Sequence, residues 1–367
     1  MPSTRWWNPV SRWLRPPRQE AHSGTAAPTL QPAFVPAEAA IAPVHAAFQD
    51  TVGRLADAPG APAISPELLR LGIVEWMIGV APVEARRAAA PAAVVTDALF
   101  ERLDEVTASE ALRSALLPRA PHVIPQLMKT LRDDGYSSAD VAAKISRDAV
   151  LTAEVIRSAT SAFRRGDNDS EEIDLAWAVA AIGTQGLRRA IASVVLRPIF
   201  DARGDTLSSR AATQIWKDAD RKAKLCSALA AQGGLDPFDG YLAGLLHNTG
   251  WTALLRAIDG FRDIPIEALG LAHAEVVPRL LRRRDALFGA LVEPWKLSPA
   301  VDRVAAEIGH GGIDAAGSPL GQALREAERL AALHALAPAG QRPSATVPGW
   351  ATLPKPVQDC YRALGRT

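Results

Sequence analysis

Apolar residues in the middle of the chain recur at the spacing of α-helices. The first clear stripe consists of Ile124, Leu127, Met128 and Leu131. These positions correspond to i, i+3, i+4 and i+7, which places their side chains on one face of a helix. Gly135 follows the stripe, and glycine is common at the residue that ends a helix. The pattern therefore predicts a helix that stops at Gly135.

Capping residues divide the next stretch into further predicted helices. Ser138 and Asp148 are N-cap candidates, and each is followed by apolar residues at helical spacing. After a charged loop over 164–172, a helix is expected to begin at Asp174 and to end at Gly183. Thr184 would cap the helix that follows. Loops this short predict helices that pack as neighbours.

The second half of the chain continues the same pattern. A predicted helix over 215–231 stops at Gly233 and Gly234, and Asp236 with Pro237 starts the next one. Ser298-Pro299 and Ser318-Pro319 each place an N-cap and a first-turn proline before an apolar stripe. We find neither an alternating pattern of useful length, as a strand would show, nor an internal repeat. The expected fold class is all-α.

The stretch before residue 117 is helical but interrupted. Apolar residues at helical spacing predict helices over 46–55, 66–80 and 92–106, and nothing there has the spacing of a catalytic site. The first 33 residues are rich in proline and arginine, which predicts a disordered tail. The alternative is a weak contact with a membrane or a partner through Trp6, Trp7 and Trp13.

Composition narrows the classes of protein that fit. The 367 residues carry 41 Lys+Arg and 40 Asp+Glu, so the formal charge of +1 gives no general reason to bind nucleic acid. The two cysteines, Cys226 and Cys360, lie far apart, which fits a reducing cytoplasm. The apolar stretch over 71–83 is broken by Glu75 and Pro82. We therefore expect a cytoplasmic chain with no transmembrane segment and no secretory signal.

Six separated stretches resemble one family in order and spacing. They are LPRAPHVIPQLMKTLRD at 117–133, ISRDAVLTAEVIRSATSAF at 145–163, IDLAWAVAAIGTQGLRRAIAS at 173–193, GLLHNTG at 244–250, HAEVVPRLLRR at 273–283 and AAEIGHGG at 305–312. This set resembles the HDOD domain, the HD-related output domain of bacterial signalling proteins and a degenerate branch of the HD phosphohydrolase superfamily. The resemblance implies a multi-helix HD-like bundle.

These observations give an expected domain organisation. A disordered tail over 1–33 is followed by a small helical N-terminal region over 34–117 and by the HDOD domain over 118–312. A C-terminal helix within 313–340 is expected to pack on the HDOD domain, and 341–367 is expected to be a proline-containing tail.

The resemblance also identifies a candidate pocket in which metal ligands are missing. Members of the HD superfamily hold a metal with an adjacent His and Asp, but this chain has His247-Asn248, and Asp218 stands at the position of the first histidine. His273 and His310 match later histidines of the family. Three histidines and one aspartate would suit zinc chemically. We instead expect these residues to hydrogen-bond helix ends and one another, with no metal, no cofactor and no catalysis.

A run of arginines is the other candidate. Arg279, Arg282, Arg283 and Arg284 lie on a predicted amphipathic helix, where they form either a surface for an acidic partner or an ordinary solvated face. The expected function is non-catalytic bacterial signal transduction through protein–protein interaction with signalling proteins. The alternatives are a phosphohydrolase or phosphodiesterase with an altered metal set, and a nucleotide sensor that uses the HD-type pocket.

Overall fold

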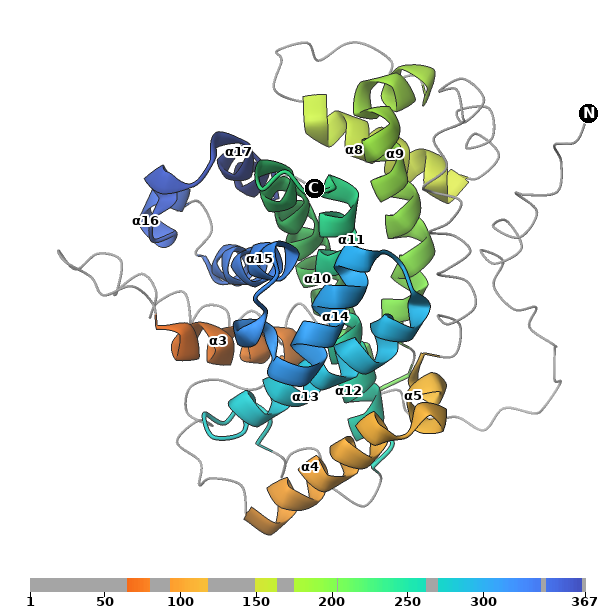
Figure 1. Ribbon diagram of the computed structural model, residues 1–367, viewed down its shortest axis with the longest axis vertical. Helices are drawn as coiled ribbons and strands as arrows, with labels where there is room; N and C mark the ends of the chain where they lie inside the picture. The colour runs from red at the N-terminus through yellow and green to blue at the C-terminus, as the bar shows by residue number, and fades with distance from the viewer. Residues whose placement is uncertain are drawn as a thin grey trace, which may run out of the picture. The chain divides into compact units, whose positions relative to one another are not determined.

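The computed structural model describes residues 65–79, 93–117, 149–163, 175–202, 204–261, 270–337 and 341–364. Within these ranges the regular structure is helical, with no strand, which confirms the all-α prediction (Figure 1). The chain divides into two compact units, one formed by 1–39 and 135–195 and the other by 40–134 and 196–367. The predicted tail over 1–33 and the predicted helices over 46–55 and 118–148 lie outside the described residues.

The first unit contains α8 (Ala149–Phe163) and most of α9 (Leu175–Phe200). Gly183 interrupts α9 with φ 62° and ψ −175°, so the predicted break lies at the expected residue. By length and composition, Ala178–Phe200 is apolar enough to cross a membrane, but half of its most apolar window is buried inside the protein. Core helices of soluble proteins show the same property.

The second unit is built around α10 (Leu207–Gln232), which packs against α11 (Pro237–His247), α12 (Thr249–Asp259) and α15 (Pro319–Leu336). Helix α13 (Val277–Val292) packs against α12 and α14 (Pro299–Gly311). The side chains of Asp236, Ser298 and Ser318 accept hydrogen bonds from first-turn backbone N–H groups, which confirms the predicted caps.

Two glycines of α11, Gly240 and Gly244, allow α10 and α11 to approach closely. A Cβ atom at Gly244 would lie 2.6 Å from the Lys222 carbonyl oxygen and 2.6 Å from the Cα atom of Ala223. Only a residue without a side chain fits this contact. The close approach brings the buried face of α10 directly against the end of α11, where His247 and Asn248 lie.

Three helices that precede the family motifs belong to the same unit. Helix α3 (Pro66–Ile78) packs on α10 and α15, whereas α4 (Ala93–Ala108) packs on α12 and α13 and is followed by α5 (Glu110–Leu116). Val74 of α3 and Leu99 of α4 are completely buried. The N-terminal helices therefore complete the core of the second unit.

The C-terminal stretch differs from the expected tail. It contains α16 (Pro343–Thr346) and α17 (Lys355–Ala363), and α17 packs against α10. Pro343 and Pro356 stand in the first turns of these two helices, where a missing backbone N–H costs nothing. Val357 and Tyr361 are buried, so the folded body extends to the end of the described residues.

Candidate functional site: a buried ion cluster

The pair His247-Asn248 lies where α11 ends and α12 begins. Both residues have no exposed surface. The start of α12 is pressed against α13, because a Cβ atom at Gly250 would lie 2.3 Å from the carbonyl oxygen of Arg284. This contact brings the polar residues of α13 next to the pair. The candidate site is therefore inside the protein, between α10, α11, α13 and α15.

A lysine of α10 lies at the centre of this site. The Nζ atom of Lys222 is 2.8 Å from Oδ1 of Asn248 and 3.2 Å from Nδ1 of His247. It is also 3.3 Å from Oδ2 of Asp218 and 3.5 Å from Oε2 of Glu328 on α15. The lysine side chain is only 1% exposed. Its ammonium thus contacts two carboxylates, an amide oxygen and an imidazole nitrogen away from bulk water.

The amide of Asn248 fits its neighbours in a way that a carboxylate would not. Its Nδ2 donates to Oδ2 of Asp218 at 2.9 Å and to the carbonyl oxygen of Ile215 at 3.0 Å, and its Oδ1 accepts from Lys222. An amide supplies both donors and an acceptor, whereas an ionised carboxylate only accepts. Asparagine at this position is therefore the residue that satisfies both a carboxylate and an ammonium.

His247 lies between two acidic side chains. Its Nδ1 is 3.0 Å from Oε2 of Glu328, and its Nε2 is 3.2 Å from Oδ1 of Asp285. The ring also meets Phe288 edge-on, with a centroid distance of 5.0 Å. Both ring nitrogens are therefore engaged within the protein.

Arg284 completes the arrangement from α13. Its guanidinium lies 2.6 Å from Oδ1 of Asp285 and 2.7 Å from Oε1 of Glu328, and it is 5.6 Å from the ring centroid of Trp251. The other oxygen of Asp285 accepts from the backbone N–H of Ile313 at 2.9 Å. We call Asp218, Lys222, His247, Asn248, Arg284, Asp285 and Glu328 the buried ion cluster.

The charges of the cluster stabilise one another. Burial alone would raise the pKa of Glu328, but Arg284 and Lys222 outweigh it and hold that pKa well below its ordinary value. Burial likewise opposes ionisation of Asp285, yet Arg284 and the hydrogen bond with His247 lower its pKa. The two carboxylates in turn raise the pKa of Arg284 despite its burial. The cluster therefore keeps these three groups ionised without an external ion.

The structure brings together only part of the predicted pocket. Asp218, His247 and Asn248 meet as expected, but His273 and His310 do not join them. His310 is exposed, and its Nδ1 lies 2.8 Å from the carbonyl oxygen of Ala306. His273 Nδ1 accepts from the backbone N–H of Glu275. These two imidazoles therefore bond to a helix end and a local turn, which is one of the two kinds of hydrogen bond expected of the pocket residues.

The predicted arginine surface also needs correction. Arg284 is buried in the cluster. Arg279 lies 3.0 Å from Asp97 and 4.0 Å from the ring centroid of Phe100, which is also 4.9 Å from Arg283. Arg283 makes a two-pronged contact with Asp104 at 2.7 and 3.0 Å, and Arg282 donates to the carbonyl oxygen of His310. Arg279 and Arg283 therefore hold α4, and Arg282 holds the end of α14, while the side chains of Arg279 and Arg282 remain partly open to solvent.

Sequence reasoning missed three members of the cluster, although their positions carry a signal. Lys222 lies on the apolar stripe of α10 that includes Ala219 and Cys226, and Asp285 lies four residues after the buried Leu281. Glu328 lies four residues after the buried Leu324 on α15. A charged residue on a core-facing stripe requires a buried partner, so spacing alone would have marked these residues as paired.

The residues do not fit the metal ion that the HD superfamily implies. Metal ligands need free lone pairs, whereas here the oxygens and ring nitrogens face Lys222, Arg284 or each other. In the part of the chain that the structure describes, no group of three or more His, Cys, Asp or Glu side chains could hold a metal. We therefore derive no chemistry through a metal at this site.

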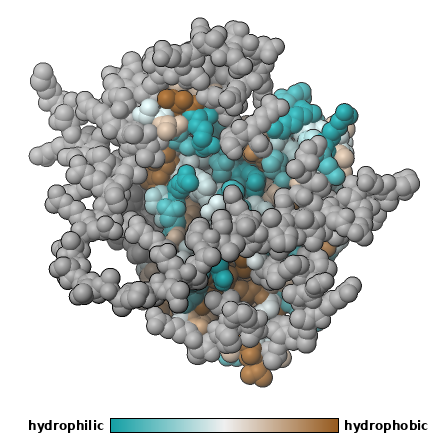
Figure 2. Space-filling model, turned by 180° about the vertical axis from the view of Figure 1, so that it is seen from behind, coloured by the Kyte–Doolittle hydropathy of each residue, from teal (hydrophilic) through white to brown (hydrophobic). Residues whose placement is uncertain are grey.

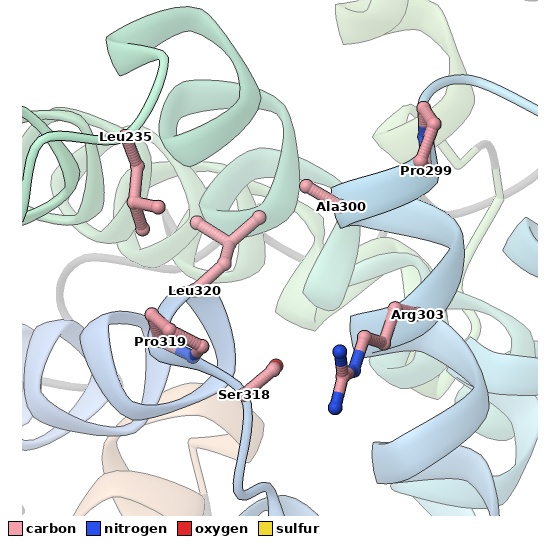
Figure 3. A pocket seen from close by; sticks show the side chains of 7 residues that line it. All are labelled: Leu235, Pro299, Ala300, Arg303, Ser318, Pro319 and Leu320. Atoms are coloured by element: carbon pink, nitrogen blue, oxygen red, sulfur yellow. The ribbon is translucent and has the colours of Figure 1, made fainter.

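A separate surface pocket offers little chemistry. It has a volume of about 270 Å³ and is lined by Leu235, Pro299, Ala300, Arg303, Ser318, Pro319 and Leu320 (Figure 3). The charged residue in this lining, Arg303, lies 3.0 Å from Glu307 and is exposed to solvent. The pocket lacks the convergent polar groups that mark an active site.

Comparisons with known proteins identify the fold and the family of the chain. The architecture is an HD-like fold, similar to a crystal structure named "Putative metal-dependent phosphohydrolase" from Shewanella amazonensis SB2B. That likeness has a TM-score of 0.52 and 20% identity, and it covers 74% of this chain and 99% of the other. The pattern of the HDOD domain matches residues 117–308, more than half of the chain. The chain belongs to the HDOD domain family.

Two further relatives carry no assigned function. An HDOD domain protein with unknown function from Geobacter sulfurreducens is 20% identical, with a TM-score of 0.46, over 73% of this chain and 89% of its own. An uncharacterized protein from Treponema pallidum (strain Nichols) is 26% identical over 196 residues. That match covers 49% of this chain but only 37% of the relative, so the chain spans well under half of that curated protein.

Proposed function

We propose that this HDOD protein is a non-catalytic regulator of bacterial signal transduction that acts by binding other proteins. The observation that carries the proposal is the burial of His247-Asn248 inside a cluster that supplies its own cations. Membership of the HDOD family supports a role in the output of bacterial signalling pathways. The partners are signalling proteins, and neither nucleic acid nor a transmembrane anchor is part of the proposal.

The chemistry of HD-type hydrolysis argues for the same reading. A catalytic metal site keeps one coordination position open for water or substrate, and the metal lowers the pKa of the bound water. His247 and Asn248 have no exposed surface, and their side-chain polar atoms all contact protein groups. A substrate phosphate would also meet no exposed cation of the cluster, because Lys222 and Arg284 are buried.

The surface is the remaining place for function. On the face in Figure 2, the described residues are largely hydrophilic, with smaller hydrophobic patches between them. The cysteines also fit the proposed cytoplasmic location, since Cys226 is buried and burial raises the pKa of its thiol to about 12, which keeps it unreactive.

The proposal is tested by assaying the whole purified chain for turnover and for complex formation. Nucleotides, cyclic dinucleotides and a chromogenic phosphodiester are offered with Mg²⁺, Mn²⁺ or Zn²⁺, with H247A as the background control. We expect no turnover above H247A. We also expect one bacterial signalling protein to form a saturable complex when both purified proteins are mixed.

Two outcomes would replace the proposal with an alternative. Metal-dependent turnover that disappears in H247A would favour a phosphohydrolase or phosphodiesterase with an altered metal set. Saturable binding of a nucleotide without cleavage, abolished by H247A, would favour a nucleotide sensor.

A further inference from the structure

We infer that Lys222 is a tethered internal cation that takes the place of a metal ion, and that removing it opens a site for a divalent cation. This inference rests on the same buried ion cluster as the proposed function. It goes further because it assigns a role to one residue and names the ligand class that the remaining side chains would accept. The ligand class is a divalent ion such as Zn²⁺ or Mn²⁺.

The first argument is convergence of donor atoms. The Nζ atom of Lys222 lies within 3.5 Å of two carboxylate oxygens, one amide oxygen and one imidazole nitrogen. Carboxylate oxygens and imidazole nitrogens are common ligands of zinc. They reach the lysine from α10, from α15 and from the junction of α11 and α12. An ammonium is therefore enclosed where ligand atoms of the metal-binding type meet.

The second argument is distance. The ammonium contacts span 2.8 to 3.5 Å, whereas zinc binds nitrogen and oxygen at about 2.0–2.2 Å. Once the ammonium is gone, the ligands have to close in by about 1 Å each to reach those values. The side chain of Glu328 is 22% exposed, so it can move and also gives an ion a route from solvent. The cluster can therefore tighten around a smaller ion.

The third argument is charge. The carboxylates of Asp218, Asp285 and Glu328 face two permanent cations, Lys222 and Arg284. A divalent ion added to this set would sit against the lysine ammonium and be repelled. Without Lys222, three carboxylates face Arg284 alone. The excess of two negative charges then matches one divalent ion.

The helix contact explains why the ammonium is held so well. Lys222 lies at a close approach of α10 and α11, where Gly244 allows its backbone to contact the neighbouring helix. The lysine stem is enclosed along its whole length, since the residue is 1% exposed. Because the ammonium is covalently attached and fixed by packing, holding it costs no loss of translational freedom. A metal ion bound from solution does lose that freedom.

The experiment compares K222A with the unmodified chain and with K224A. Lys224 is a matched control because it lies on the same helix and pairs with an aspartate four residues earlier, Asp220, at 2.7 Å, but it is 30% exposed. Each protein is purified with EDTA and then mixed with Zn²⁺ or Mn²⁺. The readouts are the melting temperature and the metal retained after gel filtration, measured by mass spectrometry.

We expect the unmodified chain and K224A to retain no metal and to melt at the same temperature with or without it. In EDTA, K222A should melt about 5–10 °C lower, because Asp218 and Glu328 then lose the ammonium that lies between them. Zn²⁺ or Mn²⁺ should recover about 5 °C and remain bound at about one ion per chain. The double variant K222A/H247A should lose both effects.

The opposite results overturn the inference. They are a K222A protein that binds no divalent ion, or an unmodified chain that holds one ion per chain. If K222A is insoluble with and without zinc, K222Q replaces it, and a melting temperature of K222Q that does not respond to Zn²⁺ overturns the inference equally. A failed K222A experiment leaves the proposed function standing, because that function is tested by turnover of the unmodified chain.

Discussion

The ammonium of Lys222 lies 2.8 Å from the side-chain oxygen of Asn248, although 26 residues separate them in the sequence. The same asparagine donates to Asp218. Asn248 thus joins a buried cation to a buried carboxylate at the position where HD-type enzymes carry an aspartate. The contact is the structural consequence of the Asp-to-Asn difference in the motif, and it makes the exchange testable.

Restoring the family residue at this position is predicted to harm the protein. In N248D, the new carboxylate would face Asp218 and could no longer donate to the carbonyl oxygen of Ile215. We expect a loss of about 2 kcal/mol of unfolding free energy at pH 7, measured by urea titration. We also expect no hydrolysis, because Lys222 still fills the centre of the cluster. Increased stability or phosphodiester turnover by N248D would contradict this explanation.

The stability of the chain should depend on pH through Glu328. The folded state lowers the pKa of this residue well below 4.5, because Arg284 and Lys222 outweigh the effect of burial. The stabilisation is therefore complete above about pH 4.5 and is lost as the pH falls through the folded-state pKa.

The variant E328Q tests this dependence. At pH 7 it should cost about 2–3 kcal/mol of unfolding free energy, since it leaves Arg284 and Lys222 short of a charged partner. The difference from the unmodified chain should shrink as the pH falls below 4.5. The matched control is E326Q, because Glu326 lies on the same helix in a half-exposed pair with Arg329 and should have little effect. An equal loss at every pH would contradict the role of Glu328 as an ionised partner.

The arginines of α13 are predicted to stabilise the fold. Arg283 makes a two-pronged contact with Asp104 and lies near the ring of Phe100, which is 1% exposed. We therefore expect R283E to lower the unfolding free energy by about 1 kcal/mol.

A charge exchange separates the ion pair from a general effect of the substitution. The double variant R283E/D104R should be more stable than R283E, because the exchanged charges can pair again. The single variant D104R should be less stable than the unmodified chain. The comparison is made by urea titration at low and high salt, because screening should weaken the recovery. If R283E has the same unfolding free energy as the unmodified chain, Arg283 does not stabilise the fold. It would then be a candidate for binding an acidic partner, as the sequence alone allows.

Much of the fold could be predicted from the sequence because helix signals are local. Ser298 and Ser318 cap helices as their Ser-Pro dipeptides indicate, and Gly183 breaks α9 where expected. The stretch 341–367 is harder to interpret from sequence, because a proline starts a helix when it lies in the first turn and interrupts one elsewhere.

The site was harder to predict because its contacts are distant in sequence. The residue pair His247-Asn248 could be found from the motif alone. However, Glu328 is 106 residues away from Lys222, and only the packing of α15 on α10 brings them together. The run of arginines predicts a shared exposed face for Arg284 and its neighbours. In the structure, Arg284 lies on the buried face of α13 beside Asp285. Burial of a charged residue depends on helix packing, which a short run of residues does not specify.

The most direct test of the account is the metal content of the unmodified chain. The protein is purified without chelators, passed through gel filtration, and analysed by mass spectrometry for Mg, Mn, Fe, Co, Ni and Zn, with H247A beside it. Since Lys222 fills the centre of the cluster, we predict no divalent metal at stoichiometric level in either protein. One tightly held ion per unmodified chain that is absent from H247A would contradict the central claim that this HD-type site carries its own cation.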